Sequence, residues 1–152
     1  MKLSTRVRYG VRAMVELAKQ PDNKPVPLRL LADNQQISPK YLEQMASSLK
    51  IAGLLESVRG AEGGYRLAKP AEDITIWDIY QVLDISVQPA DCFGASCTRK
   101  DLCSAQELWM ELADSITDIL ESYNLEDLAQ REMELQLHTD PSQMGGRCAK
   151  RT

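Results

Sequence analysis

The 152-residue sequence predicts a mainly α-helical fold with one small β-hairpin, in which an N-terminal unit is followed by a long separate helix. Apolar residues recur at three- and four-residue intervals in several segments, as amphipathic helices require. The periodicity changes after Gly53, where two short segments flank the glycine-rich stretch "RGAEGG". A further apolar stripe over residues 104–123 is left without an obvious cover inside the chain.

Three helices are predicted before any strand. The first covers residues 5–19, with apolar residues at helical spacing and arginines on its other faces, and "PDNKPVP" ends it. The second covers residues 28–36. The third begins at Ser38, a side chain suited to capping a helix, with Pro39 at the first helical position, and it stops at Gly53.

The two segments after the third helix complete a recognisable order. "LLESV" and "YRLAK" are predicted as the strands of a hairpin, joined by "RGAEGG". Helix, helix, capped helix and hairpin is the order of a winged helix-turn-helix, in which the third helix enters the major groove of DNA. We therefore predict a winged helix-turn-helix DNA-binding domain over residues 1–70.

The polar residues of the third helix and the hairpin tip are the candidate DNA contacts. Positions 40, 43, 44 and 47 share one helix face. Gln can pair with adenine and Glu with cytosine, Lys and Tyr commonly hold phosphate, and an arginine at the tip suits a narrow minor groove. The candidates are Ser38, Lys40, Tyr41, Glu43, Gln44, Ser47, Arg59, Gly60 and Gly64. The alternative is a solvated helix face beside an ordinary hairpin.

The charge distribution separates two parts of the chain. Residues 1–70 hold 12 Lys and Arg against 6 Asp and Glu, whereas residues 71–152 hold 6 against 16. A basic part beside an acidic one favours a partner such as double-stranded DNA for the first part. No apolar run is long enough to span a membrane and the first residues do not form a signal peptide, so we expect a cytoplasmic protein with no membrane partner.

Residues 71–130 are predicted to form a linker helix, a cysteine loop at 85–103 and a dimerisation helix at 104–123. The linker helix is capped near Thr75. A second copy is the simplest cover for the long helix, because a symmetric dimer also matches an operator with two half-sites. The stripe that would meet the second copy comprises Leu108, Leu112, Ile116, Ile119, Leu120 and Tyr123. Burial against its own N-terminal domain is the alternative. A short helix capped at Asn124 is predicted over "NLEDLAQREMEL", and a flexible tail is assigned to residues 131–152.

The cysteine loop carries three of the four cysteines. Cys92, Cys97 and Cys103 follow a C-x4-C-x5-C pattern. Thiolates are soft ligands suited to iron-sulfur clusters, but the pattern alone leaves a cluster, zinc and redox-active thiols open. Enzymatic function is not expected, since the chain has no Ser-His-Asp set, no CxxC and no Cys-His pair with catalytic spacing.

Several stretches together resemble the Rrf-type winged helix-turn-helix transcription factors, in particular their IscR-like iron-sulfur regulators. They are "MKLSTRVRYGVRAMVELA", "SPKYLEQ", "SVRGAEGGY", the cysteine trio and "LW" at 108 and 109, and they cover about residues 1–130. The resemblance implies a homodimeric bacterial regulator that binds a DNA operator and carries a cluster on its cysteine loop. It favours a 2Fe-2S cluster over 4Fe-4S, with iron-sulfur assembly proteins as candidate donors.

The chain departs from that resemblance at one position. IscR-type sequences have a histidine three residues after the third cysteine, where this chain has Gln106. The candidates for a fourth ligand are Gln106, Glu107, a carboxylate of the partner subunit and Cys148. Two further readings of the same fold stay open: a CymR-like regulator that responds to a metabolite or partner, with incidental cysteines, and a zinc- or thiol-based redox sensor.

Overall fold

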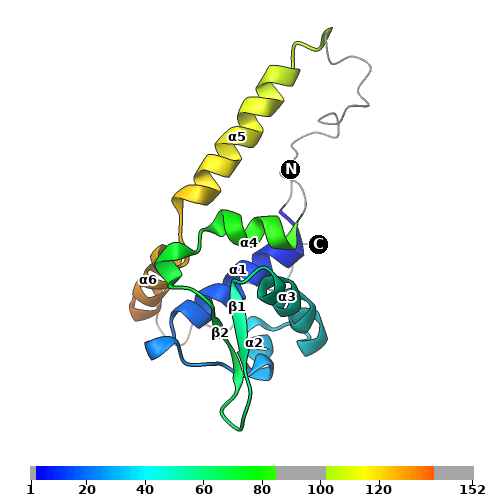
Figure 1. Cartoon of the computed structure of the whole chain (residues 1–152). Helices are drawn as coiled ribbons and strands as arrows, with labels where there is room; N and C mark the ends of the chain where they lie inside the picture. Colours follow the sequence, from blue (N-terminus) through cyan, green and yellow to red (C-terminus); the bar gives the residue numbers. More distant parts are fainter. Residues whose placement is uncertain (1–2, 85–101, 139–152) are drawn as a thin grey trace.

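The computed structural model describes residues 3–84 and 102–138 and confirms the mainly helical fold with one antiparallel hairpin (Figure 1). The elements are α1 (Thr5–Ala18), α2 (Leu28–Gln35), α3 (Pro39–Ile51), β1 (Leu55–Val58), β2 (Gly64–Leu67), α4 (Ile76–Leu83), α5 (Gln106–Ser122) and α6 (Leu125–Leu137), with single 3-10 turns at Pro21–Asn23 and Ala71–Asp73.

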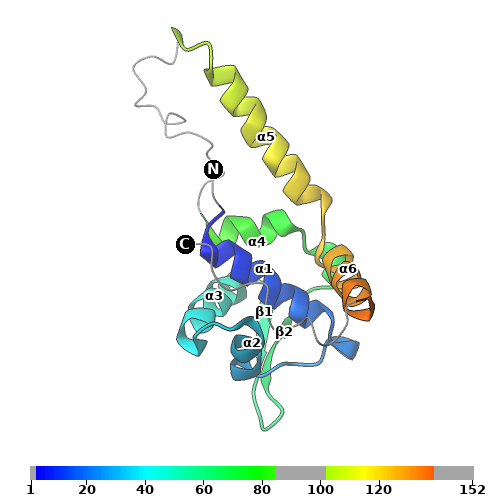
Figure 2. The ribbon, with the colours of Figure 1, turned by 180° about the vertical axis from the view of Figure 1, so that it is seen from behind.

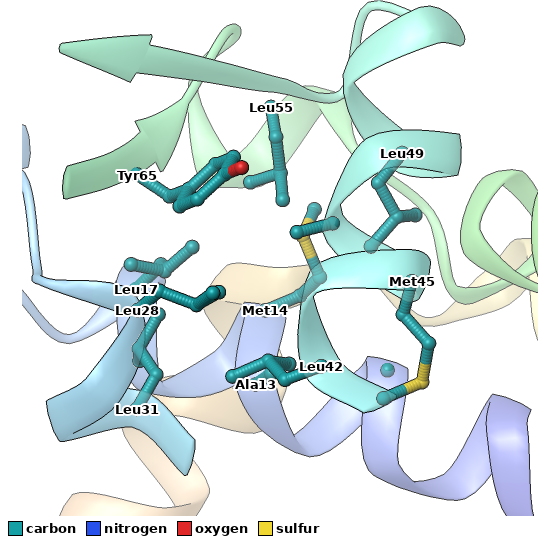
Figure 3. A pocket seen from close by; sticks show the side chains of 12 residues that line it. Ala13, Met14, Leu17, Leu28, Leu31, Leu42, Met45, Leu49, Leu55 and Tyr65 are labelled. Atoms are coloured by element: carbon teal, nitrogen blue, oxygen red, sulfur yellow. The ribbon is translucent and has the colours of Figure 1, made fainter. Parts of the chain in front are cut away.

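The core forms around α1, which lies between α2, α3, α4 and α6 (Figure 2). Met14, Met45 and Leu49 are fully buried where α1 meets α3 and the hairpin. Figure 3 shows these side chains around an apolar void of about 10 Å³. A void of this size has room for no more than one water molecule and offers it no polar partner, so it is a packing feature and not a ligand site.

Local signals fix the helix ends as the sequence predicts. The Ser38 hydroxyl accepts a hydrogen bond from the Tyr41 amide at 3.2 Å and so caps α3. Thr75 and Asp78 form a reciprocal capping box at the start of α4. Gln36 adopts a left-handed conformation with a φ of 55°, which ends α2 and turns the chain toward α3.

The hairpin is held against the α1–α2 connection as well as paired with itself. Val58 pairs with Gly64 and Leu55 with Leu67. Val26 and Tyr65 exchange backbone hydrogen bonds of 2.8 and 2.9 Å beside that pair. A Cβ atom on Gly64 would lie 2.2 Å from the Val26 carbonyl oxygen. Glycine at position 64 is therefore required by the approach of the protein's own backbone.

We expect Gly64→Ala to lower the free energy of unfolding by about 3 kcal/mol, because the new methyl group meets backbone that cannot move without breaking the Val26–Tyr65 bonds. Urea unfolding followed by circular dichroism measures the loss. Gly53→Ala is the comparison: its φ of 72° is strained for alanine but the space around it is open, so it should cost only about 1 kcal/mol. Equal losses for the two variants would contradict the backbone clash.

The chain comes back to the N-terminal unit along α5 and packs on it with α6. α5 projects away from the other elements, at the end of the molecule opposite the hairpin tip (Figure 1). At its base, the Ile76 amide donates to the Tyr123 carbonyl and the Leu125 amide to the Ile74 carbonyl, both at 2.9 Å. α6 then packs on α1, with Leu125 and Ala129 buried.

The structure corrects the boundary of the predicted tail. Residues 131–137 belong to α6, which continues to Leu137. The capping box of Asn124 and Asp127 starts this helix at the predicted cap, and the helix runs through the predicted segment "NLEDLAQREMEL" to Leu137. Residues 139–152 lie outside the described part of the chain.

Candidate nucleic-acid interface and cysteine segment

α3 presents a polar face to solvent while its opposite face is buried. Lys40, Glu43, Gln44 and Ser47 are exposed. Leu42, Met45, Ala46 and Leu49 are buried against the core. The side chains that could read DNA bases therefore stand on a rigid helix and are free to reach a groove.

Tyr41 is placed differently from the other polar residues of α3. It is half-buried, and its ring meets the ring of Tyr9 on α1 edge to face, with centroids 6.4 Å apart and planes at 89°. The Arg12 guanidinium lies 5.6 Å from the centre of the Tyr9 ring. The Tyr41 ring thus helps to hold α3 against α1, and any phosphate contact would use its hydroxyl group alone.

A hydrogen-bond chain supports the reading face from behind. Arg6 Nη2 donates to Ser48 Oγ at 2.8 Å, and Ser48 Oγ donates to the Gln44 carbonyl at 3.2 Å. The first turn of α1 is thereby joined to the backbone of a candidate base-reading residue. This role could not be predicted from the sequence, since an arginine on an outer helix face carries no signal that it reaches a residue 42 positions away on another helix.

The hairpin tip is exposed and shaped by glycine. Arg59 and Gly60 are both exposed, and Gly60 has a φ of 126°, a backbone angle that residues with a side chain rarely adopt. A Cβ on Gly63 would lie 2.4 Å from the Val58 carbonyl oxygen. Lys50 Nζ donates to Ser57 Oγ at 3.3 Å, so the last turn of α3 and the first strand of the hairpin are linked.

Only one thiol of the predicted cysteine trio lies in the described residues. Cys92 and Cys97 fall outside them. Cys103 is free and half-buried just before α5, and its carbonyl accepts from the Gln106 amide at 3.1 Å. Gln106 and Glu107 occupy the first turn of α5, the former half-buried and the latter exposed. Across residues 3–84 and 102–138 no three metal-ligating side chains come together, so the full ligand set stays a prediction.

The apolar stripe of α5 is left uncovered by the rest of the described chain. No residue of α5 is buried, and Leu108 and Ile119 are 56% and 59% exposed. Leu112 and Tyr123 are exposed too, while Ile116 and Leu120 are partly covered. The predicted alternative, burial of the stripe against the N-terminal domain, is therefore wrong for most of these residues.

None of the described helices is both long and apolar enough to cross a membrane.

Comparison with known proteins identifies the family. The model of the family described as "Rrf2: Iron-dependent Transcriptional regulator" matches residues 3–131. The chain belongs to the Rrf2 family of transcriptional regulators. An Rrf2 regulator is not an enzyme, in agreement with the missing catalytic sets, and the winged helix-turn-helix prediction is confirmed.

The relatives of this chain include two kinds of Rrf2 regulator, CymR and IscR, at nearly equal sequence identity. The transcriptional regulator CymR of Bacillus subtilis is 40% identical over 129 residues, which cover 85% of this chain and 90% of that protein. IscR of Pectobacterium atrosepticum is 41% identical over 129 residues, covering 84% and 79%. Among solved structures, T. potens IscR matches with a TM-score of 0.76 at 36% identity, covering 92% of this chain and 94% of that one.

Proposed function

We propose that this Rrf2 protein is a homodimeric regulator that binds a DNA operator through α3 and the hairpin tip and senses the state of an iron-sulfur cluster, 2Fe-2S in preference to 4Fe-4S. The observation that carries the proposal is the trio Cys92, Cys97 and Cys103, whose last member stands directly before α5. The family description and the IscR relatives support it. We place the protein in the cytoplasm, with iron-sulfur assembly proteins as cluster donors.

The donor set fits such a cluster. Cys103 is free and partly exposed, and thiolates are the preferred ligands of iron-sulfur centres. Gln106 and Glu107 stand within one helical turn of it, so an amide or carboxylate oxygen is available where IscR-type proteins have a histidine. A bound cluster would supply an inorganic group whose loss or change of charge reports iron, oxygen or nitric oxide.

The residues around α5 suggest how a signal would reach DNA. α5 leads from Cys103 to Tyr123, whose carbonyl is hydrogen-bonded to Ile76 at the start of α4. α4 packs on both α1 and α3. A change in the position of α5 would therefore move the base of the DNA-binding unit, and a cluster that favours one dimer geometry would shift the population able to bind an operator.

We expect anaerobically purified protein to be coloured, with iron and sulfide in equal amounts, and a Cys92→Ala, Cys97→Ala, Cys103→Ala variant to be colourless. Visible absorption with iron and sulfide analysis gives the result, and the iron count per chain separates 2Fe-2S from 4Fe-4S. The control is Ser104→Ala, which changes a neighbour of Cys103 outside the candidate ligands and should keep the cluster. Cys148→Ala should also keep it if Cys148 is a bystander, and should make it labile if Cys148 is the fourth ligand. Gln106→Ala and Glu107→Ala test the fourth ligand, since loss of the true ligand should make the cluster more labile in air.

The similarity to CymR, nearly equal to that of IscR, favours one second candidate: a regulator of the same fold whose cysteines hold no cluster. Colourless wild-type protein after reconstitution with iron and sulfide would support it. Zinc or thiol redox sensing would then be tested by metal analysis and by operator binding before and after oxidation. An operator-binding curve that is the same with and without the cluster would also reject cluster sensing.

A further inference from the structure

A polar pocket lies where α1, α2 and α6 meet, and no residue of α3 or α5 lines it. Its volume is about 420 Å³, within the usual range for small-molecule sites. α1 contributes Arg12, Glu16 and Lys19, α2 contributes Asn34 and Gln35, and α6 contributes the rest. Three helices from two parts of the chain therefore line one hollow.

The pocket holds an ordered set of charges. Lys19 Nζ lies 2.9 Å from Glu16 and 3.0 Å from Glu132, and its side chain is only 11% exposed. Burial acts to lower the pKa of Lys19, but the hydrogen bonds and charges of the two carboxylates outweigh it and raise the pKa. One protonated amine thus serves two carboxylates. Asn34 Nδ2 also donates to Glu16 Oε1 at 3.3 Å and Gln136 Nε2 to Glu132 Oε1 at 3.5 Å, so Glu132 Oε2 is the oxygen of this pair without a recorded partner in the described chain.

Arg12 supplies a cation on the same wall. It is exposed, and within the described residues its only recorded contact is with the face of the Tyr9 ring. No carboxylate in that part of the chain pairs with it. A guanidinium without an anionic partner at the edge of a pocket is suited to a carboxylate of a ligand, which it can bind with two parallel hydrogen bonds.

Gln35 is a second, independent indication that this pocket binds a molecule. Its side chain is 7% exposed, and its Oε1 atom is buried without a hydrogen-bond partner in the described chain. A buried acceptor left unsatisfied is costly. Gln35 lines the pocket, so an N–H or O–H group of a bound molecule is suited to satisfy this acceptor.

The geometry points to a binding site for a small zwitterion of amino-acid size, with its carboxylate on Arg12 and its ammonium group among Glu16, Glu132 and Gln35. Such a molecule would complete the hydrogen bonding of both charged groups and of the buried amide. Its occupancy would join α6, which continues from α5, to the two helices that precede α3. The site uses none of the three cysteines of the proposed cluster and would give the regulator a second input.

The test uses the full-length protein and the twenty common amino acids, with acetate and methylamine as probes that carry one charge each. We expect at least one amino acid to bind with a Kd below about 1 mM by calorimetry. At tenfold excess over its Kd it should raise the Tm by about 3 °C or more. Acetate and methylamine should bind at least tenfold more weakly, because each satisfies only one side of the pocket.

Two matched variants locate the site. Arg12→Met should weaken binding of that amino acid at least tenfold, whereas Arg8→Met, which removes another exposed α1 arginine outside the pocket, should leave it unchanged. Glu132→Gln, with circular dichroism to verify folding, should weaken it as well. The proposal is overturned if no amino acid binds saturably, if acetate binds as tightly as the amino acid, or if Arg12→Met affects operator binding alone.

Discussion

Ile119→Asp on α5 is expected to convert the proposed dimer to monomer and to lower affinity for a two-half-site operator by about 100-fold or more. Ile119 is 59% exposed in the single chain and belongs to the stripe that a second copy would cover. A carboxylate buried there without a partner costs several kcal/mol, which an apolar helix pair cannot recover. Once the subunits separate, the second half-site no longer binds as part of the same molecule.

Sedimentation and operator titration of the same samples measure both effects. Met110→Asp is the matched control, since Met110 is also an exposed apolar residue of α5 but lies among Glu107, Glu111 and Asp114. It should remain dimeric and bind the operator normally. A dimeric Ile119→Asp protein, or dissociation of the Met110→Asp protein to the same extent, would show that the subunits meet on another surface.

Much of the fold could be predicted because helix caps and apolar spacing are local features of the sequence. Ser38 and Pro39 mark the start of α3 in the sequence and do so in the structure. Four residues of α4 at helical spacing, namely Ile76, Ile79, Tyr80 and Leu83, are all buried. Each of these signals depends on neighbours within one or two helical turns, which a linear sequence displays directly.

The features that could not be predicted depend on distant contacts. The Asn124 cap predicts the start of α6, whereas the packing of this helix on α1 could not be predicted from the sequence. Gly64 is a predicted DNA contact, but a Cβ atom at this position would also meet the Val26 carbonyl of the protein's own backbone. The pocket charges Lys19 and Glu132 are 113 residues apart in the chain. No periodicity brings such pairs together before the tertiary structure is known.

The candidate DNA-binding site also combines features that could be predicted from the sequence with features that could not. The exposure of Lys40, Glu43 and Gln44 follows from helical spacing alone and agrees with the structure. The support of Gln44 by Ser48 and Arg6 was visible only in three dimensions. A side chain that reads a base must be held in a fixed position. Because the Gln44 backbone is supported by Ser48 and Arg6, Gln44 is the residue of α3 that we choose for the test.

Gln44→Ala is expected to reduce discrimination at one operator position, and to cost about 1–3 kcal/mol of binding to the preferred sequence, a 5- to 150-fold loss. Gln44 is exposed on α3, and its amide can pair bidentately with an adenine. Operators selected from a random pool by the wild-type protein provide the reference sequence. Titration of that sequence and of its single-base variants then measures the loss of discrimination.

Lys40→Ala provides the contrast on the same exposed face. A lysine that holds a phosphate should weaken binding to every sequence alike and reduce the slope of log affinity against log salt by about 1. Arg59→Ala should act at A·T-rich positions flanking the α3 contact, since a tip arginine reads groove width. If Gln44→Ala weakened all sequences equally while Lys40→Ala altered base preference, the roles of the two residues would be exchanged and the proposed assignment of α3 contacts would be rejected.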